Sequence, residues 1–69
     1  MQRKRVNSSR LRSVGYDEAN QVLEVEMSNG QVYQYSRVSP EVYRRFMAAP
    51  NPTSFFEDRI AEEYTARRA

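Results

Sequence analysis

The stretch 23–35, written LEVEMSNGQVYQY, decides the fold of this 69-residue chain. Asn29-Gly30 lies in its middle and is the strongest short-range signal for a β-hairpin. Before this pair, apolar side chains alternate with acidic ones over five residues: Leu23, Glu24, Val25, Glu26 and Met27. Such alternation is typical of a strand with one buried face and one wet face. The stretch therefore predicts two antiparallel strands joined by a tight turn.

The length of that turn decides which side chains share a face, because a slip of one residue exchanges the two faces of a strand. A two-residue turn would pair Ser28 with Gln31. A three-residue loop, with Gly30 left-handed as a β-bulge, would pair Met27 with Gln31. We choose the longer loop, because it groups the apolar side chains in two facing pairs: Val25 with Tyr33, and Leu23 with Tyr35.

The first strand is expected over about residues 10–16. Its apolar members are Leu11, Val14 and Tyr16, and the three-residue step between the first two breaks strict alternation. A bulge near Arg12-Ser13 would restore the alternation. Residues 1–8 are polar and basic without periodicity, and we expect them to form a flexible arm in front of a single domain at 9–66.

Two helices are expected after the hairpin. Ser39-Pro40 combines an N-cap with proline at the first helical position, and Pro50 ends this helix by about Ala48. Ser54 and Glu57 form an S-x-x-E capping box for a second helix running to about residue 66. The helices present apolar stripes that we assign to the core: Tyr43, Phe46, Met47, Phe55, Phe56, Ile60 and Tyr64. The expected fold is α+β, a three-stranded antiparallel β-meander followed by two α-helices packed on one face.

The composition excludes several chemistries. The chain has no cysteine and no histidine, so it lacks disulfides, the common zinc ligands and the usual general base. Glu24 and Glu26 share one strand face, and we interpret them as ordinary surface rather than as a catalytic pair. We expect no catalytic residues, no metal site and no cofactor. With neither an apolar run of membrane-spanning length nor the apolar core of a signal peptide, a cytoplasmic bacterial protein is expected.

The net charge of +2 hides an uneven distribution. Five cations precede the first acid, Asp17, and two follow the last acid, Glu63, so the ends carry +7 and the middle −5. Basic segments of this kind attract RNA and DNA, and they also occur as solvated tails that keep small domains in solution. The charge pattern therefore leaves both interpretations open.

Four segments of the chain together resemble the KTSC domain, a small bacterial module named for its place at the C-terminus of some lysyl-tRNA synthetases. They are VNSSRLRSVGYD (6–17), LEVEMSNGQVYQY (23–35), SPEVY (39–43) and FFEDRIAEEY (55–64). The central Tyr-x-Tyr element of the family falls on Tyr33-Gln34-Tyr35. Met27 departs from the family pattern, because an aromatic residue is expected at its position. The resemblance implies a free-standing protein of this size without an established activity. RNA binding has been suggested for the family.

Nucleic-acid binding is the sharper functional hypothesis. Aromatic side chains on a sheet can stack unpaired bases while arginines hold the backbone. The candidate residues are Arg3, Lys4, Arg5, Arg10, Arg12, Arg37, Tyr33 and Tyr35, with Arg44 and Arg45 as further candidates. The chosen register puts both tyrosines under the helices, which favours burial in the core with their hydroxyls reaching the rim. In that case the basic side chains, mostly arginines, would bind phosphate with little sequence choice and strong salt dependence.

A protein-interaction module is the rival class. A three-stranded meander has two edges, and a free edge accepts a strand from a partner or from a second copy. The expected state is a monomer or a weak dimer, and the partner is RNA, another polyanion or a protein.

Overall fold

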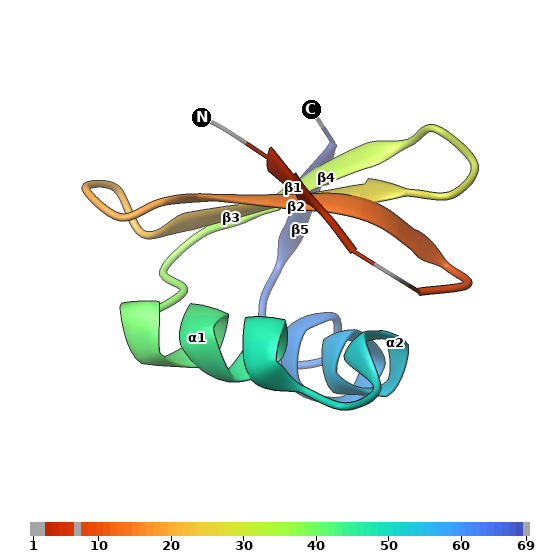
Figure 1. The fold of residues 1–69 in the computed structure, drawn as a ribbon. Coiled ribbons are helices and arrows are strands. Elements are labelled where there is room, and N and C mark those ends of the chain that lie inside the picture. The colour runs from red at the N-terminus through yellow and green to blue at the C-terminus, as the bar shows by residue number, and fades with distance from the viewer. Residues whose placement is uncertain (1–2, 7, 69) are drawn as a thin grey trace.

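A computed structural model describes residues 3–6 and 8–68. A five-stranded antiparallel sheet forms one layer, and the helices cover one of its faces (Figure 1). The strands lie in chain order across the sheet: β1 (Arg3–Arg5), β2 (Leu11–Asp17), β3 (Val22–Met27), β4 (Val32–Tyr35) and β5 (Ala66–Arg68). The helical segments are α1 (Pro40–Ala48), α2 (Pro52–Phe55) and the π-helical turn η1 (Phe56–Ile60). No helix in the described part of the chain is both long and apolar enough to cross a membrane.

The expected α+β class and the antiparallel meander are confirmed, but the number of strands was wrong. β1 pairs with β2, with Lys4 opposite Val14, and β5 pairs with β4, with Arg67 opposite Gln34. A meander of three strands leaves a row of unpaired backbone groups on each edge, and the two chain ends satisfy them. The expected flexible arm thus contains a strand at residues 3–5, and the sheet extends beyond the expected boundaries of 9 and 66.

The central hairpin adopts the expected register. Met27 N donates to Gln31 O over 2.8 Å, Gly30 N donates to Met27 O over 3.0 Å, and Gly30 has a φ of +92°. Val25 faces Tyr33 and Leu23 faces Tyr35 across the strands. The three-residue loop with a left-handed glycine is confirmed.

The bulge in the first long strand is also confirmed. The register between β2 and β3 shifts between Leu11 and Ser13. Leu11 and Val14 are consequently both buried in the core, although three positions separate them in the sequence. The strand runs one residue further than expected, to Asp17.

The first helix begins and ends as expected. Ser39 is the N-cap, and its Oγ accepts a hydrogen bond from Val42 N over 3.3 Å. Pro40 is the first helical residue, and the helix ends at Ala48, two residues before Pro50. Serine and proline suit these positions because the first turn has free N–H groups and proline brings none.

The second helix differs from the expectation at both ends. Asn51 is the cap instead of Ser54: its Oδ1 accepts from Ser54 N over 3.2 Å, and Pro52 follows at the first helical position. The helix then widens into a π-helical turn, where Ala61 N donates to Phe56 O over 2.7 Å, and it ends at Ile60. It does not reach residue 66 because residues 66–68 pair with β4 instead.

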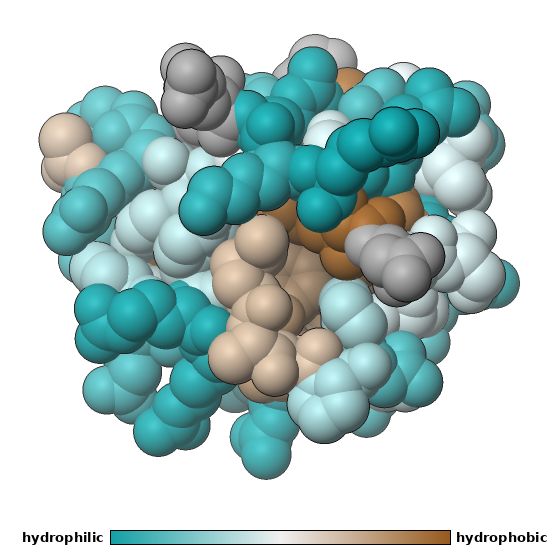
Figure 2. Space-filling model, viewed as in Figure 1, coloured by the Kyte–Doolittle hydropathy of each residue, from teal (hydrophilic) through white to brown (hydrophobic). Residues whose placement is uncertain are grey.

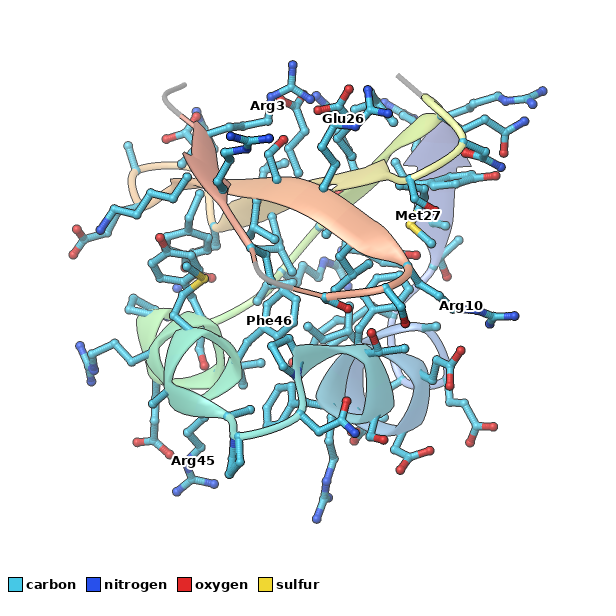
Figure 3. The ribbon with its side chains drawn as sticks, turned by 45° about the vertical axis from the view of Figure 1, so that its right-hand side comes forward. Arg3, Arg10, Glu26, Met27, Arg45 and Phe46 are labelled. Carbon is cyan, nitrogen blue, oxygen red and sulfur yellow. The ribbon has the colours of Figure 1, made fainter. Side chains whose placement is uncertain are left out.

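The core lies between the sheet and the helical layer. Phe46 on α1 points into it (Figure 3) and is 1% exposed. Most of the expected core is confirmed, with Phe56 and Ile60 buried and Tyr43, Met47, Phe55 and Tyr64 half-buried against them. Val38 is completely buried, and the sequence offered no sign of this because Val38 stands alone between polar residues in a connection.

Candidate nucleic-acid interface

The two edge strands carry most of the basic residues of the chain ends. All six side chains of β1 and β5 are exposed, and five of them are cationic: Arg3, Lys4, Arg5, Arg67 and Arg68. By register, Arg3, Arg5 and Arg67 belong to the sheet face that the helices leave open. Four strand spacings of about 4.8 Å put the two edges ~19 Å apart. Two segments from opposite ends of the sequence thereby frame one open face.

The centre of that open face is acidic and half-buried. Glu24 and Glu26 stand on β3 with side chains 17% and 22% exposed. Arg3 reaches both of them, with Nε 3.5 Å from Glu24 Oε2 and Nη1 3.8 Å from Glu26 Oε1. Figure 3 shows Arg3 and Glu26 together on the side away from the helices. The positive charge of Arg3 therefore offsets part of the negative charge at the centre of the open face.

Further hydrogen bonds complete this network. Arg12 Nη1 lies 3.6 Å from Glu26 Oε2, and Ser13 Oγ donates to Glu26 Oε1 over 2.9 Å. Gln34 Nε2 donates to Glu24 Oε1 over 3.0 Å. Both carboxylates thus hold neighbouring strands together, which is a structural role for a pair that the sequence suggested only as surface.

The candidate cations divide into paired and unpaired groups. Arg3 and Arg12 belong to the network on β3, and Arg10 Nη1 lies 2.6 Å from Glu57 Oε2 on η1. Within residues 3–6 and 8–68, Lys4 and Arg5 form no ion pair. Phosphate binding by a paired arginine competes with its glutamate, so the unpaired cations are the stronger candidates.

The two candidate tyrosines are on the helix side of the sheet. Tyr35 is 4% exposed and meets Phe56 edge to face, with ring centroids 5.7 Å apart. Tyr33 is half-buried, and its hydroxyl donates to Gln31 Oε1 over 2.5 Å. The core interpretation is correct for Tyr35, because its ring is enclosed and cannot stack on a base. Neither tyrosine contributes to the open face.

A groove next to β5 was not foreseen from the sequence. Its volume is about 700 Å³, and its lining includes Arg37, Glu63, Tyr64 and Arg67. Arg37 is exposed and has a φ of +63°. No local signal could have found this site, because its residues come together only through the pairing of β4 with β5.

A second hollow is lined mainly by apolar residues and lies between β1 and the end of α1. Figure 2 shows it as a brown and tan area below the polar side chains of the first strand. Its volume is about 310 Å³, and its apolar lining is Val6, Phe46, Met47, Ala49, Pro50 and Pro52. Arg5 of β1 also belongs to its lining.

These observations define a small α+β domain, an antiparallel five-stranded sheet with basic edge strands and one helical layer. The sequence profile of the KTSC domain matches residues 7–64, which is most of the chain, so this protein belongs to the KTSC domain family. The crystal structure of a KTSC domain protein from Yersinia pestis superposes with a TM-score of 0.92 at 36% identity. That superposition covers 99% of this chain and 96% of the other.

Two relatives are similar in sequence. An uncharacterized protein of Stutzerimonas stutzeri (strain A1501) is 49% identical over 49 residues, which is 71% of this chain and 69% of the relative. A protein of Tsukamurella paurometabola is 33% identical over 61 residues, which is 88% of this chain and 91% of the relative. The resemblance found in the sequence is confirmed. Both basic edge strands, at 3–5 and 66–68, lie outside the residues that the family profile matches.

Proposed function

We propose that this KTSC domain is a non-enzymatic RNA-binding module that holds the phosphate backbone along its basic edges, chiefly through the N-terminal segment with β1 and the adjoining β2. The observation that carries the proposal is the placement of five exposed cations on the two edge strands. Backbone contacts of this kind supply affinity without sequence choice and weaken steeply with salt. The absence of histidine and cysteine from the sequence supports a role other than catalysis.

The unpaired cations are the main contacts in this proposal. Lys4 and Arg5 on β1 offer their full charge to a phosphate, whereas Arg3 and Arg12 already face the glutamates of β3. A polyanion is therefore attracted to the edges more than to the centre of the open face, where Arg3 and Arg12 already neutralise the glutamates.

A protein-interaction module is the second candidate, and the apolar hollow beside β1 favours it. Strand addition is the less favourable form of such binding here. β1 and β5 cover the edges of the meander, and short basic edge strands resist pairing with further strands.

The test is fluorescence anisotropy of a labelled single-stranded RNA of mixed sequence, titrated with the full chain at two salt concentrations. We expect binding that weakens at the higher salt, with log K falling by about 0.7 per phosphate contact and decade of salt. Arg5→Gln should weaken binding and reduce that slope by about 0.7.

Arg44→Gln is the matched control, because it removes one charge from an exposed position on α1, which belongs to the helical layer. Equal losses from Arg5→Gln and Arg44→Gln would show that net charge, rather than the edge strand, attracts RNA. No binding by the unaltered chain at low salt would overturn the proposal, and the apolar hollow would become the surface to pursue.

A further inference from the structure

The groove beside β5 lies between two connections that are far apart in the sequence. Tyr35 pairs with Ala66, so the chain leaving β4 and the chain entering β5 run side by side. Both connections pass between the sheet and the helical layer (Figure 1, green and blue). The groove volume of about 700 Å³ falls in the usual range for small-ligand sites.

The groove combines cationic, aromatic and hydroxyl groups. Arg37 belongs to the connection after β4 and Arg67 to β5; both line the groove, and both are exposed. Neither forms an ion pair with an acidic side chain of residues 3–6 and 8–68. Ser36 and Thr65 add hydroxyls to the lining. Two guanidinium groups with hydroxyls nearby suit a phosphate, because guanidinium forks bind its oxygens through paired N–H donors.

The backbone of Arg37 is left-handed, with a φ of +63°. Residues other than glycine rarely adopt this conformation, and it tends to persist at binding sites. The next residue is anchored, because Val38 N donates to Gln21 O over 2.9 Å and the Val38 side chain is fully buried. The position of Arg37 at the groove is thus determined by its neighbour in the core.

Tyr64 supplies the aromatic surface. It is half-buried against the core and lines both this groove and a smaller one of about 270 Å³. The smaller groove is also lined by Arg59 and by Arg45, whose Nη2 lies 3.0 Å from Glu41 Oε1. Proteins that bind single-stranded nucleic acid often combine a tyrosine with arginines: a base stacks on the ring, and the phosphates contact the cations.

We infer that the groove holds one unpaired nucleotide of a single-stranded RNA, with its base against Tyr64 and its phosphate between Arg37 and Arg67. The inference rests on the proposed function and names the place where the RNA leaves the edge strand. Arg67 belongs to both β5 and the groove, so a backbone that follows the edge leads into the groove. Glu63 also lines the groove and can accept a hydrogen bond from a base amino group or a 2′-hydroxyl.

Anisotropy with a labelled single-stranded oligonucleotide and an RNA duplex of equal charge tests the inference. The single strand should bind more tightly, because only it can place a base in the groove. Tyr64→Leu should weaken single-strand binding about tenfold without changing the salt slope, whereas Tyr64→Phe should stay within about twofold. Arg67→Gln should reduce the slope by about 0.7.

A glycine substitution separates the role of the Arg37 side chain from that of its left-handed backbone. Arg37→Gly accepts the left-handed φ and removes only the side chain, so affinity should fall while the fold is kept. Thermal unfolding followed by circular dichroism checks that Arg37→Gly keeps the fold. Unchanged affinity in Arg37→Gly and Arg67→Gln would overturn the inference, even if Tyr64→Leu failed to fold.

The two proposals fail in different ways. If the unaltered chain binds no RNA at low salt, the proposed function is wrong. If binding depends on Arg5 but not on Tyr64, Arg37 or Arg67, the proposed function stands and the groove is excluded as the nucleotide site. Equal affinity for single strand and duplex likewise removes the groove, because a paired base cannot reach the tyrosine.

Discussion

At the scale of single residues, Gly30 determines the register of the central hairpin. Its φ of +92° closes the three-residue loop, and the Met27 to Gln31 pairing that follows puts the apolar side chains of both strands under the helices. A Cβ added at this position would meet no atom within 4 Å. The requirement for glycine is therefore a backbone requirement and involves no crowding.

Gly30→Ala should destabilise the domain by about 1–2 kcal/mol, the usual penalty for a left-handed residue with a Cβ. For a domain of this size, each kcal/mol lowers Tm by about 4–8 °C, which thermal unfolding followed by circular dichroism can measure. Gly30→Asn should lose less, since asparagine tolerates this conformation. An unchanged Tm in the alanine variant would contradict the left-handed loop.

Tyr35 gives the fold a dependence on alkaline pH. Burial raises the pKa of its hydroxyl above the ordinary value of 10.0, and the nearby Tyr33 adds to the increase. The folded chain thus favours the neutral phenol. The stabilisation is complete below the ordinary pKa and is lost as the pH rises through the pKa of the folded state.

Tyr35→Phe should therefore flatten the fall in unfolding free energy above about pH 10. The aromatic ring stays against Phe56, so stability at neutral pH should change little. Urea unfolding at pH 7, 10 and 11 provides the comparison. An equally steep alkaline decline in the variant would show that Tyr35 does not contribute to it.

At the scale of elements, the second helix shows two adjacent start signals competing. Ser54 and Glu57 fit a capping box, but Asn51-Pro52 lies upstream and starts the helix first. Once Asn51 accepts the hydrogen bond from Ser54 N, Ser54 lies inside the helix and has no free N–H to cap. The helix starts at the earlier signal because an N-cap side chain accepts hydrogen bonds from the backbone N–H groups that directly follow it.

Asn51→Ala should destabilise the domain by about 1 kcal/mol through loss of the cap, and Ser54→Ala should stay within about 0.5 kcal/mol of the unaltered chain. Both variants remove one polar group from an exposed position, so each is the control of the other. Denaturation by urea measures the difference. The reverse order of stabilities would place the cap at Ser54.

At the scale of the whole molecule, the sheet has a firm centre and exposed edges. β2, β3 and β4 contribute buried side chains to the core, whereas every side chain of β1 and β5 is exposed. The edge strands attach through backbone pairing, and β1 also through the ion pairs of Arg3. Regions with little buried apolar surface open at low free energy.

Native-state hydrogen exchange should therefore be slowest at the amides of β3 and fastest, among the strands, at those of β1 and β5. NMR at neutral pH resolves the two groups. RNA that binds along the edges should slow exchange in β1 and β5 and leave β3 unchanged. Equal protection of all five strands in the free chain would contradict this division.

The sequence by itself determined the class of fold, the register of the hairpin, the bulge in β2 and the start of α1. These features depend on neighbours in the chain: a left-handed glycine, a broken alternation, and a serine before a proline. It also identified the residue types of the candidate site, since the basic ends are visible without a structure. Local physical chemistry was sufficient for all of these.

Only the tertiary structure decided which strands complete the sheet, where the second helix ends and which arginines remain unpaired. Arg10 and Glu57 are 47 positions apart, and the groove unites Arg37 with Tyr64 and Arg67. No periodicity or motif connects such residues. The groove residues come together because β4 and β5 satisfy each other's backbone groups, and this pairing joins segments about thirty residues apart in the folded chain.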